Sequence, residues 1–132
     1  MKKFSLILVL LTGIVSSCSA APPVSGEIRD ISVADAAELV KSDDSVVVLD
    51  IRTPGEFQQG HIKGAKHIDF LADGFDEKIA KLDKNTTYLM HCASGGRSGK
   101  ALANFKSRGF TSILHLKDGF MGWEAAGLPV TK

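Results

Sequence analysis

Short apolar runs alternate along the chain with segments in which apolar residues recur every three or four positions. Val46 to Leu49 is a continuous apolar run, which is typical of a central strand buried on both faces. Thr86 to Met90 is rich in the β-branched and aromatic residues that favour strands. We expect strands over residues 27–31, 46–49, 65–68, 86–90 and 113–116.

The segments between these runs have helical spacing. Behind Ser32, a possible N-cap, apolar residues lie at i, i+3, i+4 and i+7, at Val33, Ala36, Ala37 and Val40. Thr53 to Glu56 has the form of a capping box with proline at the first helical position. Further helices are predicted over residues 75–82, 98–108 and 120–126. Strands that alternate with helices predict an α/β domain whose mainly parallel central sheet is covered by helices on both faces.

The N-terminal segment has a different character. Two lysines precede an almost wholly apolar stretch from Phe4 to Val15, which is the pattern of a secretory signal. As a helix this stretch would span roughly 18 Å, against about 30 Å of bilayer hydrocarbon, so we do not expect a membrane span. Val15-Ser16-Ser17-Cys18 resembles the lipobox of bacterial lipoproteins. This resemblance implies that residues 1–17 are a signal peptide and that Cys18 is the lipid-modified first residue of the mature protein.

A proline-rich tether, residues 18–26, then leads to a single domain, residues 27–132. The alternative is ordinary cleavage nearby, for instance after Ala20, and both readings imply export. We therefore expect a lipoprotein anchored to a bacterial membrane, or a periplasmic protein. The net charge of +1 gives no basic face for nucleic acid. We expect a monomer.

Cysteine usage points to one residue. The chain has only two cysteines, Cys18 and Cys92, too few for a disulfide scaffold. In an oxidising compartment these thiols could pair. Lipid modification of Cys18 would leave Cys92 as the only thiol.

Cys92 comes at the end of a predicted strand, before a glycine-rich loop and a helix. Ligands of parallel sheets collect at this edge. Gly95 and Gly96 let the backbone turn tightly and aim its N–H groups inward. The following helix contributes its positive N-terminus, and Arg97 contributes a cation. All three stabilise an anion, so we predict a reactive Cys92 thiol with a lowered pKa. The alternative is that Cys92 is a small buried apolar residue.

The string Cys92-Ala93-Ser94-Gly95-Gly96-Arg97-Ser98 resembles the active loop of rhodanese-like sulfurtransferases, in the form C-x-x-G-x-R-S. Residues 50–65 look like the first signature of that family, and residues 118–130 are similar to its closing segment. The resemblance implies a rhodanese-like fold and a catalytic Cys92 that takes a sulfane sulfur from a small anionic donor such as thiosulfate. The resulting persulfide passes the sulfur to a thiol or cyanide acceptor. It also implies that no cofactor or metal is needed and that the substrate is bound by Ala93, Ser94, Gly95, Gly96, Arg97 and Ser98.

This chain departs from many family members in one respect, because Ala93 stands where a large or charged residue often follows the cysteine. Arg97 is then the only cation of the loop, which puts thiosulfate in doubt as the natural donor.

Two other functions stay open. A cysteine-dependent phosphatase has the pattern H-C-x-x-G-x-x-R-S, and His91-Cys92 begins in the same way. Only four residues separate Cys92 from Arg97, however, and a phosphate needs a wider cradle than a single sulfur does. A non-catalytic sulfur-carrier or binding module is the other alternative, although inactive rhodanese-like domains usually lack the cysteine.

The remaining polar residues have simpler interpretations. The four histidines, His61, His67, His91 and His115, show no compact ligand spacing, so we predict no zinc site. We interpret His61 and His115 as structural, and Asp50 with Arg52 as an ion pair at a strand end. Whether His91 influences Cys92 stays open.

Overall fold

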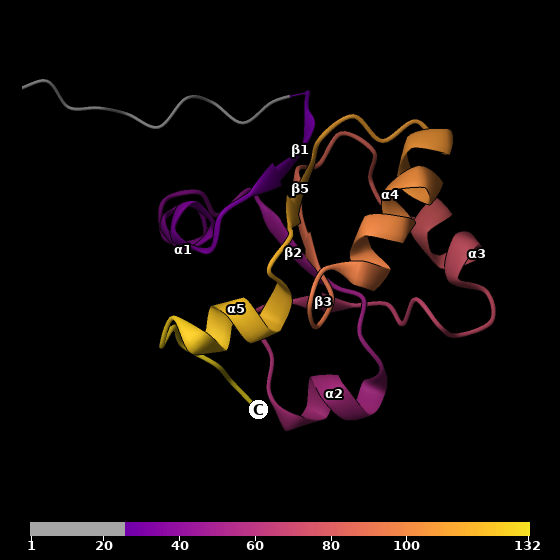
Figure 1. The fold of residues 1–132 in the computed structure, drawn as a ribbon. Helices are drawn as coiled ribbons and strands as arrows, with labels where there is room; N and C mark the ends of the chain where they lie inside the picture. The colour runs from indigo at the N-terminus through magenta and orange to yellow at the C-terminus, as the bar shows by residue number, and fades with distance from the viewer. Residues whose placement is uncertain (1–25) are drawn as a thin grey trace, which may run out of the picture.

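The computed structural model describes residues 26–132, in which five strands alternate with five helices (Figure 1). The predicted signal peptide, Cys18 and nearly all of the tether lie outside the described residues. The strands form one parallel sheet in the order β1-β5-β4-β2-β3. Their bounds are β1 Ile28–Ile31, β2 Val47–Asp50, β3 Lys66–His67, β4 Tyr88–His91 and β5 Ile113–Leu116. The predicted α/β architecture with a parallel sheet is confirmed.

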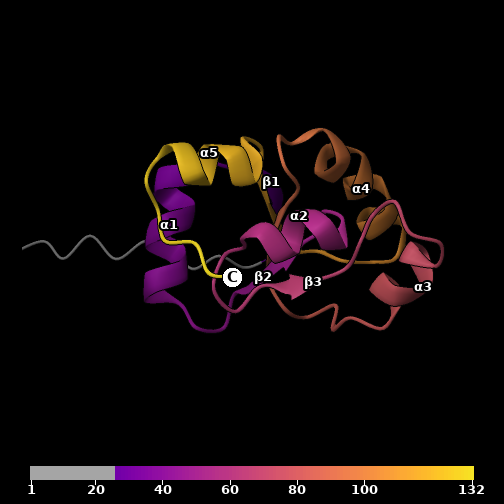
Figure 2. The same cartoon turned by 90° about the horizontal axis from the view of Figure 1, so that it is seen from below.

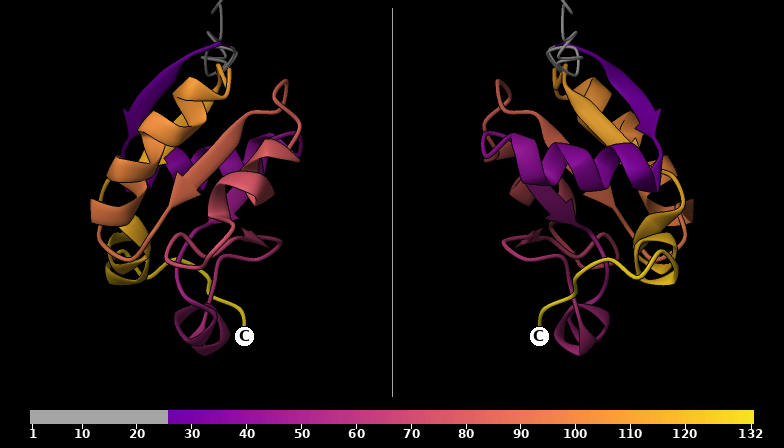
Figure 3. Two further views of the ribbon diagram at one scale, coloured as in Figure 1. Left: turned by 90° about the vertical axis from the view of Figure 1, so that its right-hand side faces the viewer. Right: turned by 90° about the vertical axis from the view of Figure 1, so that its left-hand side faces the viewer.

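Helices cover both faces of this sheet (Figures 2 and 3). On one face, α1 (Val33–Ser42) and α5 (Gly119–Ala125) pack against Val48, Leu89 and Leu114. On the other face, α3 (Phe75–Ala80) and α4 (Gly96–Ser107) pack against Leu49, Met90 and Ile113. The short helix α2 (Pro54–Gln59) lies beyond the ends of the strands, at the edge where β4 ends (Figure 1).

The alternation of side chains along β4 decides where the two residues at its end are placed. Leu89 belongs to the core under α1 and α5, whereas Met90 belongs to the core under α3 and α4. His91 follows the first set, with its ring stacked at 6.0 Å from Phe120 of α5. Cys92 follows the second set and lies in the core under α4. Because successive side chains of an extended strand point to opposite faces, the neighbours His91 and Cys92 serve different sides of the sheet.

The predicted helix starts agree with the structure in two places. Ser32 caps α1 by accepting the N–H of Asp35. Thr53 and Glu56 form the full capping box of α2, with Pro54 at its first position. Helix α4 begins at Gly96, two residues before the predicted Ser98, because Gly95 takes a left-handed conformation (φ +96°) that turns the chain directly into the helix. In residues 26–132 no helix has the length and apolar character needed to cross a membrane.

Candidate active site

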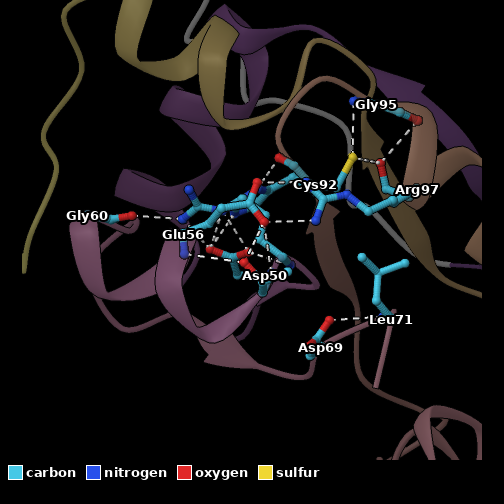
Figure 4. A network of polar contacts seen from close by, with 12 residues as sticks. Asp50, Glu56, Gly60, Asp69, Leu71, Cys92, Gly95 and Arg97 are labelled. Carbon is cyan, nitrogen blue, oxygen red and sulfur yellow. Dashed lines mark hydrogen bonds and ion pairs between the residues drawn. The ribbon is translucent and has the colours of Figure 1, made fainter. Parts of the chain in front are cut away.

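The Cys92 side chain lies beneath the loop that links β4 to α4 (Figure 4). Its Sγ accepts the backbone N–H of Gly95 at 3.1 Å and the hydroxyl of Ser98 at 3.3 Å. Burial of the thiol raises its pKa. Hydrogen bonds from the Ser98 hydroxyl and from the loop and helix amides more than offset this effect and lower the pKa of Cys92 below its ordinary value. The arrangement therefore stabilises a thiolate, as the sequence predicted.

The loop is held in place from the side of α5. The N–H groups of Phe120 and Met121 donate to the carbonyl oxygens of Cys92 and Ala93, both at 2.9 Å. This approach requires glycine at two positions. A Cβ on Gly95 would collide with the Lys117 carbonyl oxygen, and a Cβ on Gly119 would collide with the Ala93 carbonyl oxygen. Close backbone packing thus fixes where the Gly95 N–H points.

Arg97 is turned toward α2, where it forms a two-pronged ion pair with Glu56 (Figure 4). Each terminal nitrogen of its guanidinium lies 2.8 Å from one carboxylate oxygen. Arg97 is the main cause of a low pKa for Glu56, which is about 2. The cation of the loop is therefore paired with a carboxylate, and the pair ties the loop to α2. The implied role of Arg97 in donor binding stays a prediction.

Asp50 and Arg52 form the predicted ion pair at the end of β2. Both side chains are buried, with 2.7 Å between Arg52 Nη2 and Asp50 Oδ2. Arg52 also donates to the Gly60 carbonyl oxygen at 2.7 Å and lies 3.9 Å above the Phe120 ring. Through these contacts the buried pair joins the end of β2 to the residue that follows α2 and to α5.

His91 contacts the backbone of Cys92 and makes no recorded contact with its sulfur. Its Nδ1 lies 2.9 Å from the Cys92 carbonyl oxygen, and its Nε2 has no hydrogen-bond partner and lies 3.7 Å from Asp50 Oδ2. Burial lowers the pKa of His91, against the raising effect of Asp50, so the ring is neutral at neutral pH. The contact that links His91 to Cys92 is therefore with the Cys92 carbonyl oxygen.

The rings of His61 and His67 both stack against Phe57 of α2. His61 bonds to the Phe57 carbonyl oxygen and His67 to the Arg52 carbonyl oxygen. Among residues 26–132 no three His, Cys, Asp or Glu side chains are grouped so that they could hold a metal ion.

His115 lies at the site, which the sequence interpretation missed. Its Nε2 is 2.8 Å from the Ser98 hydroxyl, and its Nδ1 is 2.8 Å from Asp30 Oδ1. The sheet order brings these residues together, because β5 lies between β4 and β1. A signal was present in the sequence: a histidine within an apolar run predicted as a strand must, if it is buried, find polar partners or remain an unsatisfied group.

Comparison with known proteins identifies relatives of this chain. The family model of the rhodanese-like domain matches residues 32–126. The putative sulfurtransferase YtwF of Bacillus subtilis is 32% identical over 103 residues, which are 78% of this chain and 97% of that protein. The thiosulfate sulfurtransferase GlpE of Ectopseudomonas mendocina is 33% identical over 99 residues, 75% of this chain and 87% of that protein.

A solved structure agrees with the sequence relatives. The rhodanese-related protein of Thermoplasma volcanium has a TM-score of 0.70 at 31% identity, covering 79% of this chain and 98% of that one. Some relatives are longer, and the chain matches only 51% of a Synechocystis protein. The family model spans most of the chain, and the match to YtwF covers 78% of this chain: the chain belongs to the rhodanese-like domain family.

Proposed function

We propose that this protein is a sulfurtransferase that carries a sulfane sulfur as a persulfide on Cys92. The observation that carries the proposal is the environment of Sγ, which accepts one backbone N–H and one hydroxyl at the start of α4. These donors stabilise the attacking thiolate, and donors fixed in this way can also stabilise the negative charge on a second sulfur bonded to it. The sulfurtransferase relatives YtwF and GlpE support the same chemistry.

The reaction has two displacements. The Cys92 thiolate attacks the outer sulfur of a donor such as thiosulfate; a bond forms between Sγ and that sulfur, and sulfite leaves with the electron pair of the broken bond. A thiophilic acceptor, cyanide or a thiol, then attacks the terminal sulfur, and the Cys92 thiolate is released. Splitting the transfer in this way replaces one difficult step by two easier ones. No cofactor takes part in either step.

The loop favours this reaction over phosphate chemistry. Four residues separate Cys92 from Arg97, and Arg97 is paired with Glu56 in the described structure. A phosphatase loop would need its arginine and several amides around three phosphate oxygens. The tight arc over Sγ is better suited to one additional sulfur atom.

We also propose that the protein is exported and held at a bacterial membrane through a lipid on Cys18, or released into the periplasm. The support is the sequence alone: the signal pattern of residues 1–17 and the lipobox-like residues that precede Cys18. Incorporation of labelled palmitate into the expressed protein, lost in Cys18→Ala, would identify the lipid anchor; no incorporation would leave simple secretion.

Intact mass spectrometry tests the sulfur transfer directly. The purified protein is measured before and after thiosulfate, and again after cyanide, with Cys92→Ser as the control. We expect the mass of one sulfur atom to be gained and then lost, and no change in Cys92→Ser. No gain with a readily alkylated thiol would indicate another donor or phosphatase chemistry, which hydrolysis of an aryl phosphate would reveal. No gain with an inert thiol would favour a binding module.

A further inference from the structure

A continuous chain of polar contacts leads from the Cys92 sulfur across three strands of the sheet. Ser98 Oγ lies 3.3 Å from Cys92 Sγ and 2.8 Å from His115 Nε2. On the other side of the ring, His115 Nδ1 lies 2.8 Å from Asp30 Oδ1. The members come from α4, β5 and β1, elements that are far apart in the sequence.

The chain of contacts is buried at its centre and open at its end. Ser98 is fully buried, and His115 is 5% exposed. The Asp30 side chain is 61% exposed. The path therefore begins at a thiol that solvent does not reach freely and ends at a carboxylate in contact with water.

The hydrogens available to these groups link the protonation state of Cys92 to that of His115. The Ser98 hydroxyl has one hydrogen, and a thiolate at Cys92 would accept it. The Ser98 oxygen must then accept a hydrogen from His115 Nε2, while the Asp30 carboxylate accepts another from Nδ1. A ring that donates from both nitrogens is an imidazolium, so a thiolate at one end corresponds to a protonated His115 at the other. The Gly95 carbonyl oxygen, 3.3 Å from the Ser98 hydroxyl, is a competing acceptor when the cysteine is a thiol.

We infer that Ser98 and His115, with Asp30 orienting the ring, relay the Cys92 proton away when the thiol ionises for attack on the sulfur donor. The S–H bond breaks and its proton passes to Ser98 Oγ, while the hydroxyl proton of Ser98 passes to His115 Nε2. One positive charge is thereby created on His115, balanced by the thiolate and by Asp30. Return of the thiolate to the thiol runs the same steps backward. Ser98 touches the reacting sulfur, whereas His115 and Asp30 act through it as positioning residues. The role in turnover rests on the proposed sulfurtransferase function; the relay itself does not.

His115 is faced by one charged group and one hydroxyl group. The carboxylate of Asp30 faces it from β1, and the hydroxyl of Ser98 faces it from α4. Its register neighbour on β4 is the uncharged Met90. Gly99 of α4 leaves room beside the ring, since a Cβ there would lie 3.9 Å from His115 Cε1. Arg97 also acts on the thiolate, but it is paired with Glu56.

The pH dependence of Cys92 alkylation tests the relay without requiring sulfur transfer. The rate of reaction of the full protein with iodoacetamide is measured from pH 4 to pH 10 for the wild type, His115→Asn, Ser98→Ala and the double variant. His61→Asn is the matched control, because it removes an imidazole that has no contact with this chain of residues. Circular dichroism verifies that each variant is folded.

We expect His115→Asn to move the midpoint of the profile upward and to slow alkylation at pH 6 at least tenfold, while the plateau at high pH is unchanged. If His115 acts through Ser98, adding His115→Asn to Ser98→Ala should not move the alkylation midpoint further than Ser98→Ala alone does. A profile for His115→Asn that coincides with those of the wild type and His61→Asn would overturn the relay. So would a His115 effect that is fully retained without the Ser98 hydroxyl, because that would indicate a long-range charge effect. The mass-spectrometric test of the persulfide can fail or succeed independently of either result.

Discussion

The ion pair between Arg97 and Glu56 predicts a pH-dependent contribution to stability that one substitution isolates. Glu56→Gln removes the charge but keeps a residue that can complete the capping box with Thr53, so the start of α2 is preserved. The variant therefore reports on the pairing with Arg97 rather than on the helix. Glu38→Gln on α1 is the matched control, because its carboxylate is exposed and lies 3.7 Å from Lys41.

The magnitude follows from the pKa of Glu56, which falls from 4.5 to about 2 on folding. At about 1.4 kcal/mol per pKa unit, this corresponds to an upper bound of about 3.5 kcal/mol. The Glu56 and Arg97 side chains are 35% and 23% exposed, and solvent screening reduces the expected value to about 1 kcal/mol. A depressed pKa in the folded state contributes stability above the unfolded value, 4.5, and that stability is lost as the pH falls toward 2.

Urea unfolding at pH 7 and pH 3 measures the effect. At pH 7 we expect Glu56→Gln to have a free energy of unfolding about 1 kcal/mol below that of the wild type. Most of this difference should disappear by pH 3, whereas Glu38→Gln should match the wild type at both pH values. A deficit in Glu56→Gln that is equally large at pH 3 would refute the assignment. At pH 3 the carboxyl group is already protonated in the unfolded state, whose pKa is 4.5, so folding must take up the cost of ionising it and the contribution of the pair must fall.

Three further predictions concern the loop. Cys92→Ser should abolish sulfur transfer in a thiocyanate assay while its circular dichroism stays that of the wild type; retained transfer would disprove the mechanism. Gly95→Ala should lower stability by about 2 kcal/mol or more, measured by urea unfolding. The reason is that the added Cβ would collide with the Lys117 carbonyl oxygen. Gly127→Ala is the control, because Gly127 also has a positive φ but has open space around it, and this variant should lose less stability. Arg97→Ala should slow anionic and neutral sulfur donors alike, since Glu56 engages both terminal nitrogens. A loss of kcat/KM confined to anionic donors would instead support direct donor binding by Arg97.

The elements of the fold could be predicted because their signals are local. Val46 to Leu49 is apolar throughout because β2 is covered on both faces, and the capping box at Thr53 closes within a single turn. Cys92 could also be identified as the candidate nucleophile, since the loop and helix whose groups bond to its sulfur follow it directly in the sequence.

The partners of the site residues could not be predicted in the same way. Arg97 finds Glu56 forty-one positions away, and His115 finds Asp30 eighty-five positions away. Both contacts depend on the order of strands in the sheet and on the placement of α2, which no local pattern specifies. The sequence therefore predicted that Arg97 is a cation beside the thiol but not that a carboxylate already neutralises it.

The parallel sheet places the start of β1 and the Cys92 loop at opposite ends of its strands. β1 begins at Ile28, shortly after the predicted tether. It runs parallel to β5, and β5 runs parallel to β4. The chain therefore enters the sheet at the end of the strands opposite Cys92 (Figures 1 and 3). With the proposed lipid on Cys18, the attachment point and the reactive loop would face in opposite directions. The loop would then be presented to the aqueous compartment instead of the bilayer. Sulfur would be exchanged with water-soluble donors and acceptors, and the anchor would determine where the protein resides without determining which molecules it meets.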